Sequence, residues 1–181
     1  MRIVAGSHRG RRLEAPADDH IRPTSDRIRE SLFNILHHRL GGFVGKHVLD
    51  GFAGTGALGF EALSRGAASV LFVDQNRDAL ALCRRNAASL GLTDRSEFNL
   101  TDLTRWPAGS TVFDLVLLDP PYGKGLAGAA LNALALGGAL GPQSIAVVEA
   151  DRSQPELIPP GFAVIDSRDY GRTRIELLAR S

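Results

Sequence analysis

Residues 114–123 read DLVLLDPPYG and place an acid, two prolines and an aromatic ring directly after a short apolar run. A planar exocyclic amine is a poor nucleophile, because its lone pair is delocalised into the ring that carries it. The Asp119 carboxylate and the Pro120 carbonyl, aimed at its two N–H groups, would hold that lone pair toward an incoming methyl group. Pro120 and Pro121 fix the backbone, and Tyr122 offers a face for a flipped-out base. The alternative is a plain turn after a strand, but this combination at a strand end favours amine binding.

A second candidate site is a glycine-rich turn earlier in the chain. Gly54, Gly56 and Gly59 form G-T-G-A-L-G between a predicted strand and a predicted helix, the context in which such a turn binds a nucleotide. The glycines allow a sharp turn and close approach of a ligand. Asp74 ends the next strand, where an acid usually accepts hydrogen bonds from ribose hydroxyls. A tight strand–helix turn without a ligand is the alternative.

The glycine pattern alone does not distinguish a dinucleotide from another adenosine ligand. Three features favour S-adenosylmethionine. Asp50 precedes the turn and could hold an ammonium group, a chain of 181 residues leaves little room for the substrate domain of a dehydrogenase, and DPPY ends the fourth predicted strand. A nucleotide-binding module without catalysis would keep the glycine turn but would have no use for DPPY.

The elements that position these residues alternate between strands and helices. We predict strands at 47–50, 69–74, 96–100, 114–119 and 144–149, helices ending near 64 and covering 78–90 and 126–136, and a closing hairpin of 162–170 and 173–179. This order predicts an α/β fold with a mostly parallel, seven-stranded, doubly wound sheet and a C-terminal antiparallel strand. The fourth strand would lie beside the first, so that Asp119 opens onto the same crevice as Gly54.

A basic segment precedes this sheet. We predict that residues 1–42 form a hairpin, from 2–5 and 11–13, and a helix that starts after Pro23, whereas residues 43–181 form the catalytic domain. Residues 1–12, which we call the arm, contain four arginines and no acid, although the net charge of the whole chain is +1. Arginine suits phosphate, but a GC-rich genome would also explain an arginine excess. Because the glycine turn and Asp74 lie elsewhere in the sequence, we expect removal of the arm to spare cofactor binding.

Composition excludes several classes of protein. The sequence has no apolar run of membrane-spanning length and no secretory signal at its start. Its one cysteine, Cys83, allows neither an internal disulfide nor a cysteine-cluster metal site. We therefore expect a cytoplasmic protein that uses no metal and no membrane.

Five stretches together resemble one family: RIVAGSHRGRRL, RPTSDRIRESLFNIL, LDGFAGTGALGFEALSRGA, DPPY and YGRTRIELL. The chain resembles the bacterial 16S ribosomal RNA guanine-N2-methyltransferases, class I S-adenosylmethionine-dependent methyltransferases with a Rossmann-like fold, over nearly its whole length. The resemblance implies methyl transfer from S-adenosylmethionine to the exocyclic N2 amine of a guanine in 16S rRNA. We expect a monomer that acts on a small-subunit particle. The glycine turn and DPPY alone would also suit a methyltransferase of adenine N6 in DNA or RNA, or of protein glutamine.

Matched position by position, the resemblance implies three groups of site residues. The amine-holding group is Asp119, Pro120, Pro121 and Tyr122. The cofactor group is Asp50, Phe52, Gly54, Thr55, Gly56, Asp74 and Asp102, with Arg22, Pro23 and Thr24 in a stretch that closes over the cofactor. The RNA-contact group is Arg2, Arg9, Arg11, Arg12 and Arg29.

Three positions depart from the family's pattern. Gly51 stands where a bulky apolar residue is usual, which would loosen the turn. Ser7 and His8 stand where we expect a longer basic or aromatic pair, which puts the RNA contacts of the arm in question. Arg172 replaces a usual acid.

Overall fold

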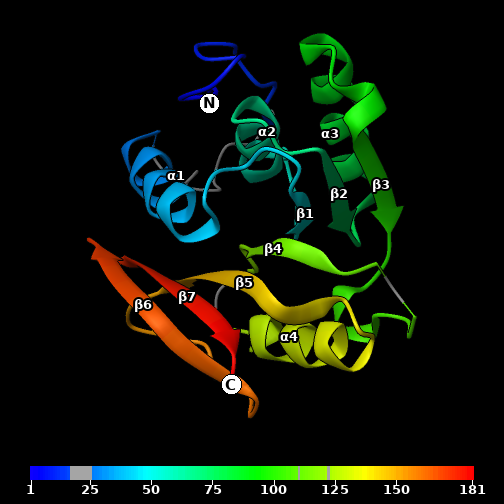
Figure 1. The fold of residues 1–181 in the computed structure, drawn as a ribbon. Helices are drawn as coiled ribbons and strands as arrows, with labels where there is room; N and C mark the ends of the chain where they lie inside the picture. Colours follow the sequence, from blue (N-terminus) through cyan, green and yellow to red (C-terminus); the bar gives the residue numbers. More distant parts are fainter. Residues whose placement is uncertain (17–25, 110, 122) are drawn as a thin grey trace.

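The computed structural model describes residues 1–16, 26–109, 111–121 and 123–181 (Figure 1). Four α-helices, two short 3₁₀ turns and seven strands follow one another along these residues: α1 Asp26–Leu40, β1 His47–Gly51, α2 Ala57–Ser64, β2 Ser69–Asp74, α3 Arg77–Leu90, η1 Thr93–Arg95, β3 Ser96–Leu100, η2 Leu103–Arg105, β4 Phe113–Leu118, α4 Leu126–Leu136, β5 Leu140–Asp151, β6 Phe162–Tyr170 and β7 Thr173–Arg180.

The strands form one sheet in the order β3-β2-β1-β4-β5-β7-β6. β1 to β5 are parallel, and β7 runs antiparallel to both of its neighbours. This arrangement confirms the Rossmann-like prediction, including the neighbouring positions of β1 and β4. Gly51 at the end of β1 pairs in register with Leu118 at the end of β4. Asp119 therefore leaves the sheet at the same edge as the glycine turn.

Helices cover both faces of the sheet. α1, α2 and α3 lie on one face and α4 lies on the other (Figure 1). The alternation of side chains along a strand sends Val48 into the core beneath α1–α3 and its neighbour Leu49 into the core beneath α4. Because both faces are covered, the central strands β1, β4 and β5 carry runs of buried apolar residues, as buried parallel strands usually do.

The arm is a hairpin-like loop that packs on α2 and α3. Arg2 and Arg12 form an antiparallel bridge, and Ile3 is buried in the same core as the side chains of α1 and α2. Val4 and Ala5 donate backbone N–H groups to the two carboxylate oxygens of Glu61, at 2.8 and 3.1 Å.

The boundary predicted after residue 42 therefore does not separate two hydrophobic cores. Glu61 is 0% exposed, and removal of the arm would take away two of its donors. A buried carboxylate that loses hydrogen-bond donors is destabilising. Removal of the arm would thus lower stability, and the expectation that it spares cofactor binding stays a prediction.

Candidate active site

Acidic side chains from four adjacent strands gather at the carboxyl-end edge of the sheet. Asp74 ends β2, Asp50 lies in β1, Asp119 follows β4 and Glu149 lies in β5. Like charges that are brought together in a partly buried place favour protonation or a cationic partner. This edge is also the place where ligands bind in open α/β sheets.

Asp50 is buried directly beneath the glycine turn. Its side chain is 2% exposed, and its Oδ2 accepts a hydrogen bond of 2.8 Å from the backbone N–H of Gly59 in α2. Burial, and to a smaller extent the nearby Asp74 carboxylate, raise the pKa of Asp50 to about 8, although the Gly59 N–H opposes the shift. The aspartate therefore ties β1 to α2, and its predicted contact with a ligand ammonium group stays a prediction.

Asp119 shares this electrostatic environment. Burial, then the carboxylates of Glu149 and Asp50, raise the pKa of Asp119 well above its ordinary value. Pro120 is buried and Pro121 is exposed, so the backbone turns out of the sheet directly after the acid. Tyr122 lies outside the described residues. A carboxyl group with a raised pKa can both accept a hydrogen bond and take up a proton more readily than an exposed one.

The glycine turn adopts backbone conformations that few residues tolerate. Gly56 has φ 78°, and a Cβ at this position would lie 2.5 Å from both the Cys83 sulfur and the Phe60 ring. Gly54 also has a positive φ, but a Cβ there would meet only open space and the Phe52 carbonyl. Phe52 itself has φ 60°, an uncommon value for a residue with a side chain. Such strain is concentrated at binding sites.

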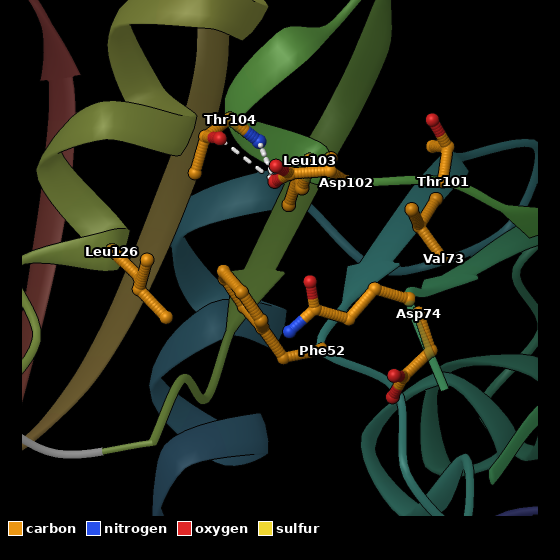
Figure 2. A pocket seen from close by; sticks show the side chains of 9 residues that line it. Phe52, Val73, Asp74, Thr101, Asp102, Leu103, Thr104 and Leu126 are labelled. Carbon is orange, nitrogen blue, oxygen red and sulfur yellow. Dashed lines mark hydrogen bonds between the residues drawn. The ribbon is translucent and has the colours of Figure 1, made fainter.

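A pocket lies beside this turn, between the ends of β2, η2 and α4 (Figure 2). It is lined by Phe52, Val73, Asp74, Gln75, Thr101, Asp102, Leu103, Thr104 and Leu126. The structure thus brings together three of the residues predicted for the cofactor, namely Phe52, Asp74 and Asp102.

The two acids of this pocket are held in different ways. Asp74 accepts hydrogen bonds from the backbone N–H groups of Gly54, at 3.0 Å, and Asn76, at 2.8 Å. Asp102 is turned toward Thr104, whose N–H and hydroxyl both donate to its Oδ1 (Figure 2). Asp74 therefore shapes the glycine turn directly, whereas Asp102 caps η2 at the pocket wall.

Gly51 does not loosen the turn. A Cβ at this position would lie 2.5 Å from Leu103 Cδ2 and 2.9 Å from Leu118 Cδ2. The space that a bulky side chain would occupy is filled by the buried side chain of Leu103, which comes from η2. The expected loosening is therefore wrong, because a residue distant in the sequence supplies the missing volume.

The arginines predicted to contact RNA differ in their surroundings. Arg9 and Arg12 are exposed. Arg2 is paired with Asp26 at 2.7 Å, and Arg11 donates to the Ser89 carbonyl. Arg29 is 1% exposed, and its Nη2 donates to Asp26 and to the Arg2 carbonyl.

Arg29 thus fastens the arm to α1. The structure argues against the predicted contact of Arg29 with RNA, because its guanidinium is buried. Arg22, Pro23 and Thr24 lie outside the described residues.

The two remaining departures from the family's pattern have defined contacts. The Ser7 and His8 backbone N–H groups bond to the carbonyl and the hydroxyl of Ser64, and His8 Nε2 lies 3.1 Å from the Leu90 carbonyl. This pair docks the arm on α2 and α3. Arg172, at the turn between β6 and β7, donates to Asp151 at 3.0 Å.

Sequence reasoning missed two buried polar residues that hold this region together. Glu61 also receives a hydrogen bond of 2.8 Å from Arg65. Its signal was an acid within the apolar helix ALGFEALS, where an unpaired charge would be costly. Asn86 is buried in α3 and contacts both Glu14, two residues past the arm, and Thr55 of the glycine turn. The sequence around Asn86 carries no comparable signal.

The described residues contain neither a membrane-spanning helix nor a metal-binding cluster. None of their helices is long and apolar enough to cross a membrane. Within the same ranges, no group of three or more His, Cys, Asp or Glu side chains is arranged to hold a metal ion.

Comparisons with known proteins agree with this geometry. A family model described as "Conserved hypothetical protein 95" matches residues 1–179. The Haemophilus influenzae protein named "Ribosomal RNA small subunit methyltransferase D" is 33% identical over 175 residues, which cover 94% of this chain and 89% of that protein. An Escherichia coli K12 protein of the same name is 36% identical over 151 residues, with 83% and 75% covered. The solved structure described as "Putative methyltransferase yhhF from Escherichia coli" has a TM-score of 0.84 at 30% identity and covers 100% of this chain and 98% of that chain.

Proposed function

Because the chain belongs to the family described as "Conserved hypothetical protein 95", we propose that it transfers a methyl group from S-adenosylmethionine to the exocyclic N2 amine of a guanine in 16S rRNA. Relatives of similar length carry names of small-subunit rRNA methyltransferases, which supports an rRNA substrate. The choice of guanine N2 rests on the resemblance of the sequence and on the amine-holding motif at Asp119.

One observation carries the proposal: Asp119 leaves β4 beside Asp50 of β1, and burial together with the carboxylates of Glu149 and Asp50 raises the pKa of Asp119. Such a place suits a ligand with positive charge, since a cation would relieve the repulsion among the carboxylates. S-adenosylmethionine carries an ammonium and a sulfonium group, so the residues present fit it. When bound, it would supply an electrophilic methyl group.

The residues that would hold the cofactor are those of the glycine turn and the adjoining pocket. Asp74 keeps lone pairs free for ribose hydroxyls, although it also accepts from Gly54 and Asn76. Phe52 and Leu126 give the pocket apolar surface for a purine ring. Asp50 lies buried below the turn, and a cationic ligand beside it would favour its charged form.

Asp119 and the Pro120 carbonyl would bind and orient the acceptor amine. Each accepts one N–H, which turns the lone pair of the nitrogen out of conjugation and toward the methyl donor. Positive charge that develops on the nitrogen is stabilised by the fixed carboxylate. Because burial and its acidic neighbours raise the pKa of Asp119, this carboxyl can hold the proton that the amine releases.

The partner that we propose is a small-subunit particle rather than naked RNA. The exposed arginines Arg9 and Arg12 form too small a surface to read a long sequence, so folded RNA and ribosomal protein would supply the remaining specificity. We propose a monomer that works in the cytoplasm, where such particles are assembled.

The test is tritium transfer from labelled S-adenosylmethionine to purified small ribosomal subunits that lack the modification, followed by digestion to nucleosides. N2-methylguanosine is the expected product. Labelled N6-methyladenosine would contradict the choice of target. The absence of any transfer, from folded protein that binds S-adenosylhomocysteine, would contradict the rRNA substrate.

A further inference from the structure

A single buried amide joins the backbone at Glu14, two residues past the arm, to the glycine turn. Asn86 lies in α3 and is 1% exposed. Its Oδ1 accepts the backbone N–H of Glu14 at 2.8 Å, and its Nδ2 donates to the Glu14 carbonyl at 3.1 Å and to the Thr55 carbonyl at 3.0 Å. Both N–H bonds of the amide group and one of its oxygen lone pairs are therefore used.

The orientation of this amide is fixed by its partners. A flipped amide would point an N–H group at the Glu14 N–H and would place its oxygen against two carbonyl oxygens. Only one orientation satisfies all three contacts. The side chain thus recognises a strand-like backbone at Glu14 and a particular direction of the Thr55 peptide at the same time.

The Thr55 peptide lies at the point where its direction affects a ligand. Thr55 stands between Gly54 and Gly56, both of which have positive φ values. Glycines turn readily in either direction, so the turn has little rigidity of its own. The hydrogen bond from Asn86 supplies rigidity from outside the turn. Thr55 Oγ1 also donates to the Met1 sulfur at 3.7 Å, a second contact between the arm and the turn.

We propose that Asn86 is a positioning residue that couples the binding of RNA at the arm to the binding of the cofactor at the glycine turn. This inference rests on the proposed function. RNA bound to the arm steadies Leu13, whose N–H donates to the Met1 carbonyl, and with it the neighbouring Glu14. Glu14 holds the Asn86 amide, and the amide holds the Thr55 peptide in its binding direction. By reciprocity, the cofactor must favour RNA binding by the same factor.

The matched variants are Asn86→Asp and Arg85→Gln. Asn86→Asp keeps the acceptor for the Glu14 N–H but sets an oxygen against the Glu14 and Thr55 carbonyls. Arg85→Gln removes the exposed ion pair with Glu14 and leaves all three Asn86 contacts in place. Equilibrium dialysis with labelled S-adenosylhomocysteine measures cofactor affinity for each protein, with and without saturating small ribosomal subunits.

We expect Asn86→Asp to weaken S-adenosylhomocysteine by roughly five- to thirty-fold, the effect of losing one or two hydrogen bonds. The affinity of Arg85→Gln for S-adenosylhomocysteine should stay within two-fold of that of wild type. Small subunits should tighten S-adenosylhomocysteine binding to wild type and to Arg85→Gln, and should leave Asn86→Asp unchanged. Wild-type affinity that does not respond to small subunits would overturn the coupling. Wild type that binds neither ligand would instead overturn the proposed function.

A measurement on wild type alone covers the case in which Asn86→Asp does not fold. Hydrogen exchange of the Glu14 amide should slow when S-adenosylhomocysteine saturates the protein, because the cofactor fixes the peptide that Asn86 holds. The Ile3 amide, which pairs with the Arg11 carbonyl inside the arm, is the control and should change less. Equal exchange of the Glu14 amide with and without S-adenosylhomocysteine would overturn the proposal.

Discussion

Asp50 and Asp119 stand at the ends of two adjacent parallel strands, and the carboxylate of Asp50 contributes to the raised pKa of Asp119. Asp50 is buried and bonded to the Gly59 N–H, whereas Asp119 follows the last residue of β4 at the same edge of the sheet. The two acids therefore differ in their surroundings. Asp50 ties the glycine turn to β1, and Asp119 is the acid that we propose meets the acceptor.

Asp119→Asn tests the division of tasks. The variant keeps the shape of the side chain but loses its charge, so methyl transfer should fall by roughly 10²–10³. Affinity for S-adenosylhomocysteine should stay within a few fold, because Asp119 does not line the cofactor pocket. Radiolabel transfer and calorimetry measure the two effects. Asp114→Asn, in the same strand but paired with Lys46, is the control that should retain activity. Normal turnover by Asp119→Asn would exclude the proposed role.

Asp50→Asn tests the effect of burial on a carboxyl group. The pKa of Asp50 is raised from 3.8 to about 8. Between these values the unfolded chain releases a proton that the folded protein keeps, so stability falls as pH rises, until the loss is complete above about pH 8. Asparagine has no proton to lose. The free energy of unfolding of the variant should therefore increase relative to that of wild type by ~1 kcal/mol per pH unit from pH 5 to 8. Above pH 8 the difference should level off.

Urea unfolding of both proteins at each pH gives this gap. Asp119 is present in both proteins, so its contribution to the free energy of unfolding largely cancels from the difference between them. A gap that does not change with pH would show that Asp50 is ionised throughout the range.

Asp74→Ala should weaken S-adenosylhomocysteine by roughly 1.5–3 kcal/mol, because the ribose loses a charged acceptor. The structure adds a second cause, since Gly54 and Asn76 lose the acceptor of their N–H groups. Calorimetry measures the affinity. Asp78→Asn, an exposed acid in the first turn of α3, serves as control. Equal affinities for Asp74→Ala and wild type would place the ribose elsewhere.

The double variant Arg9→Gln/Arg12→Gln replaces truncation as the test of the arm. Neither side chain is buried, so folding should be preserved. If each arginine neutralises one phosphate of single-stranded RNA, the log–log slope of affinity against salt should shrink by about 1.4. Filter binding across a salt series measures the slope. Arg152→Gln/Arg168→Gln, which removes two exposed arginines away from the arm, is the charge-matched control. A slope equal to that of wild type would mean that the arginine-rich start reflects genome composition.

Gly51→Ala tests the packing of Leu103 into the space beside the turn. The added methyl group meets Leu103 and Leu118, and overpacking of this kind costs about 1–3 kcal/mol of unfolding free energy. Leu103→Ala alone leaves a cavity. In the double variant the two changes should compensate in part, with a coupling energy of at least ~0.5 kcal/mol. Strict additivity in urea unfolding would show that the two positions do not share this space.

The sequence predicts the parallel sheet well for a physical reason. A strand that is buried on both faces needs a continuous apolar run, and the run at 69–74 is found as a strand with the predicted bounds. The edge strands at 96–100 and 162–170 also have the predicted bounds, although they are less apolar and partly exposed. β5 is longer than the predicted 144–149 because pairing with β4 and β7 extends it, across Gly141, Pro142 and Gln143, to Leu140–Asp151.

The parts of the candidate site that consist of residues adjacent in sequence were predictable. The glycine turn and the acid after β4 are local patterns, and the sheet brings them to one edge. The buried state of Arg29 and the contacts of Asn86 were not predictable, because each depends on a backbone carbonyl of a segment far away in the chain. The packing of Leu103 against Gly51 is of the same kind.

The docking of the arm on Glu61, Ser64 and Leu90 has a consequence for folding during translation. The ribosome makes the arm before every one of these partners. The arm therefore leaves the exit tunnel with its backbone unpaired, and it gains fixed contacts only after α2 and α3 have followed. This segment is in this way made before the residues that hold it, and its docking must wait for contacts that are distant in sequence.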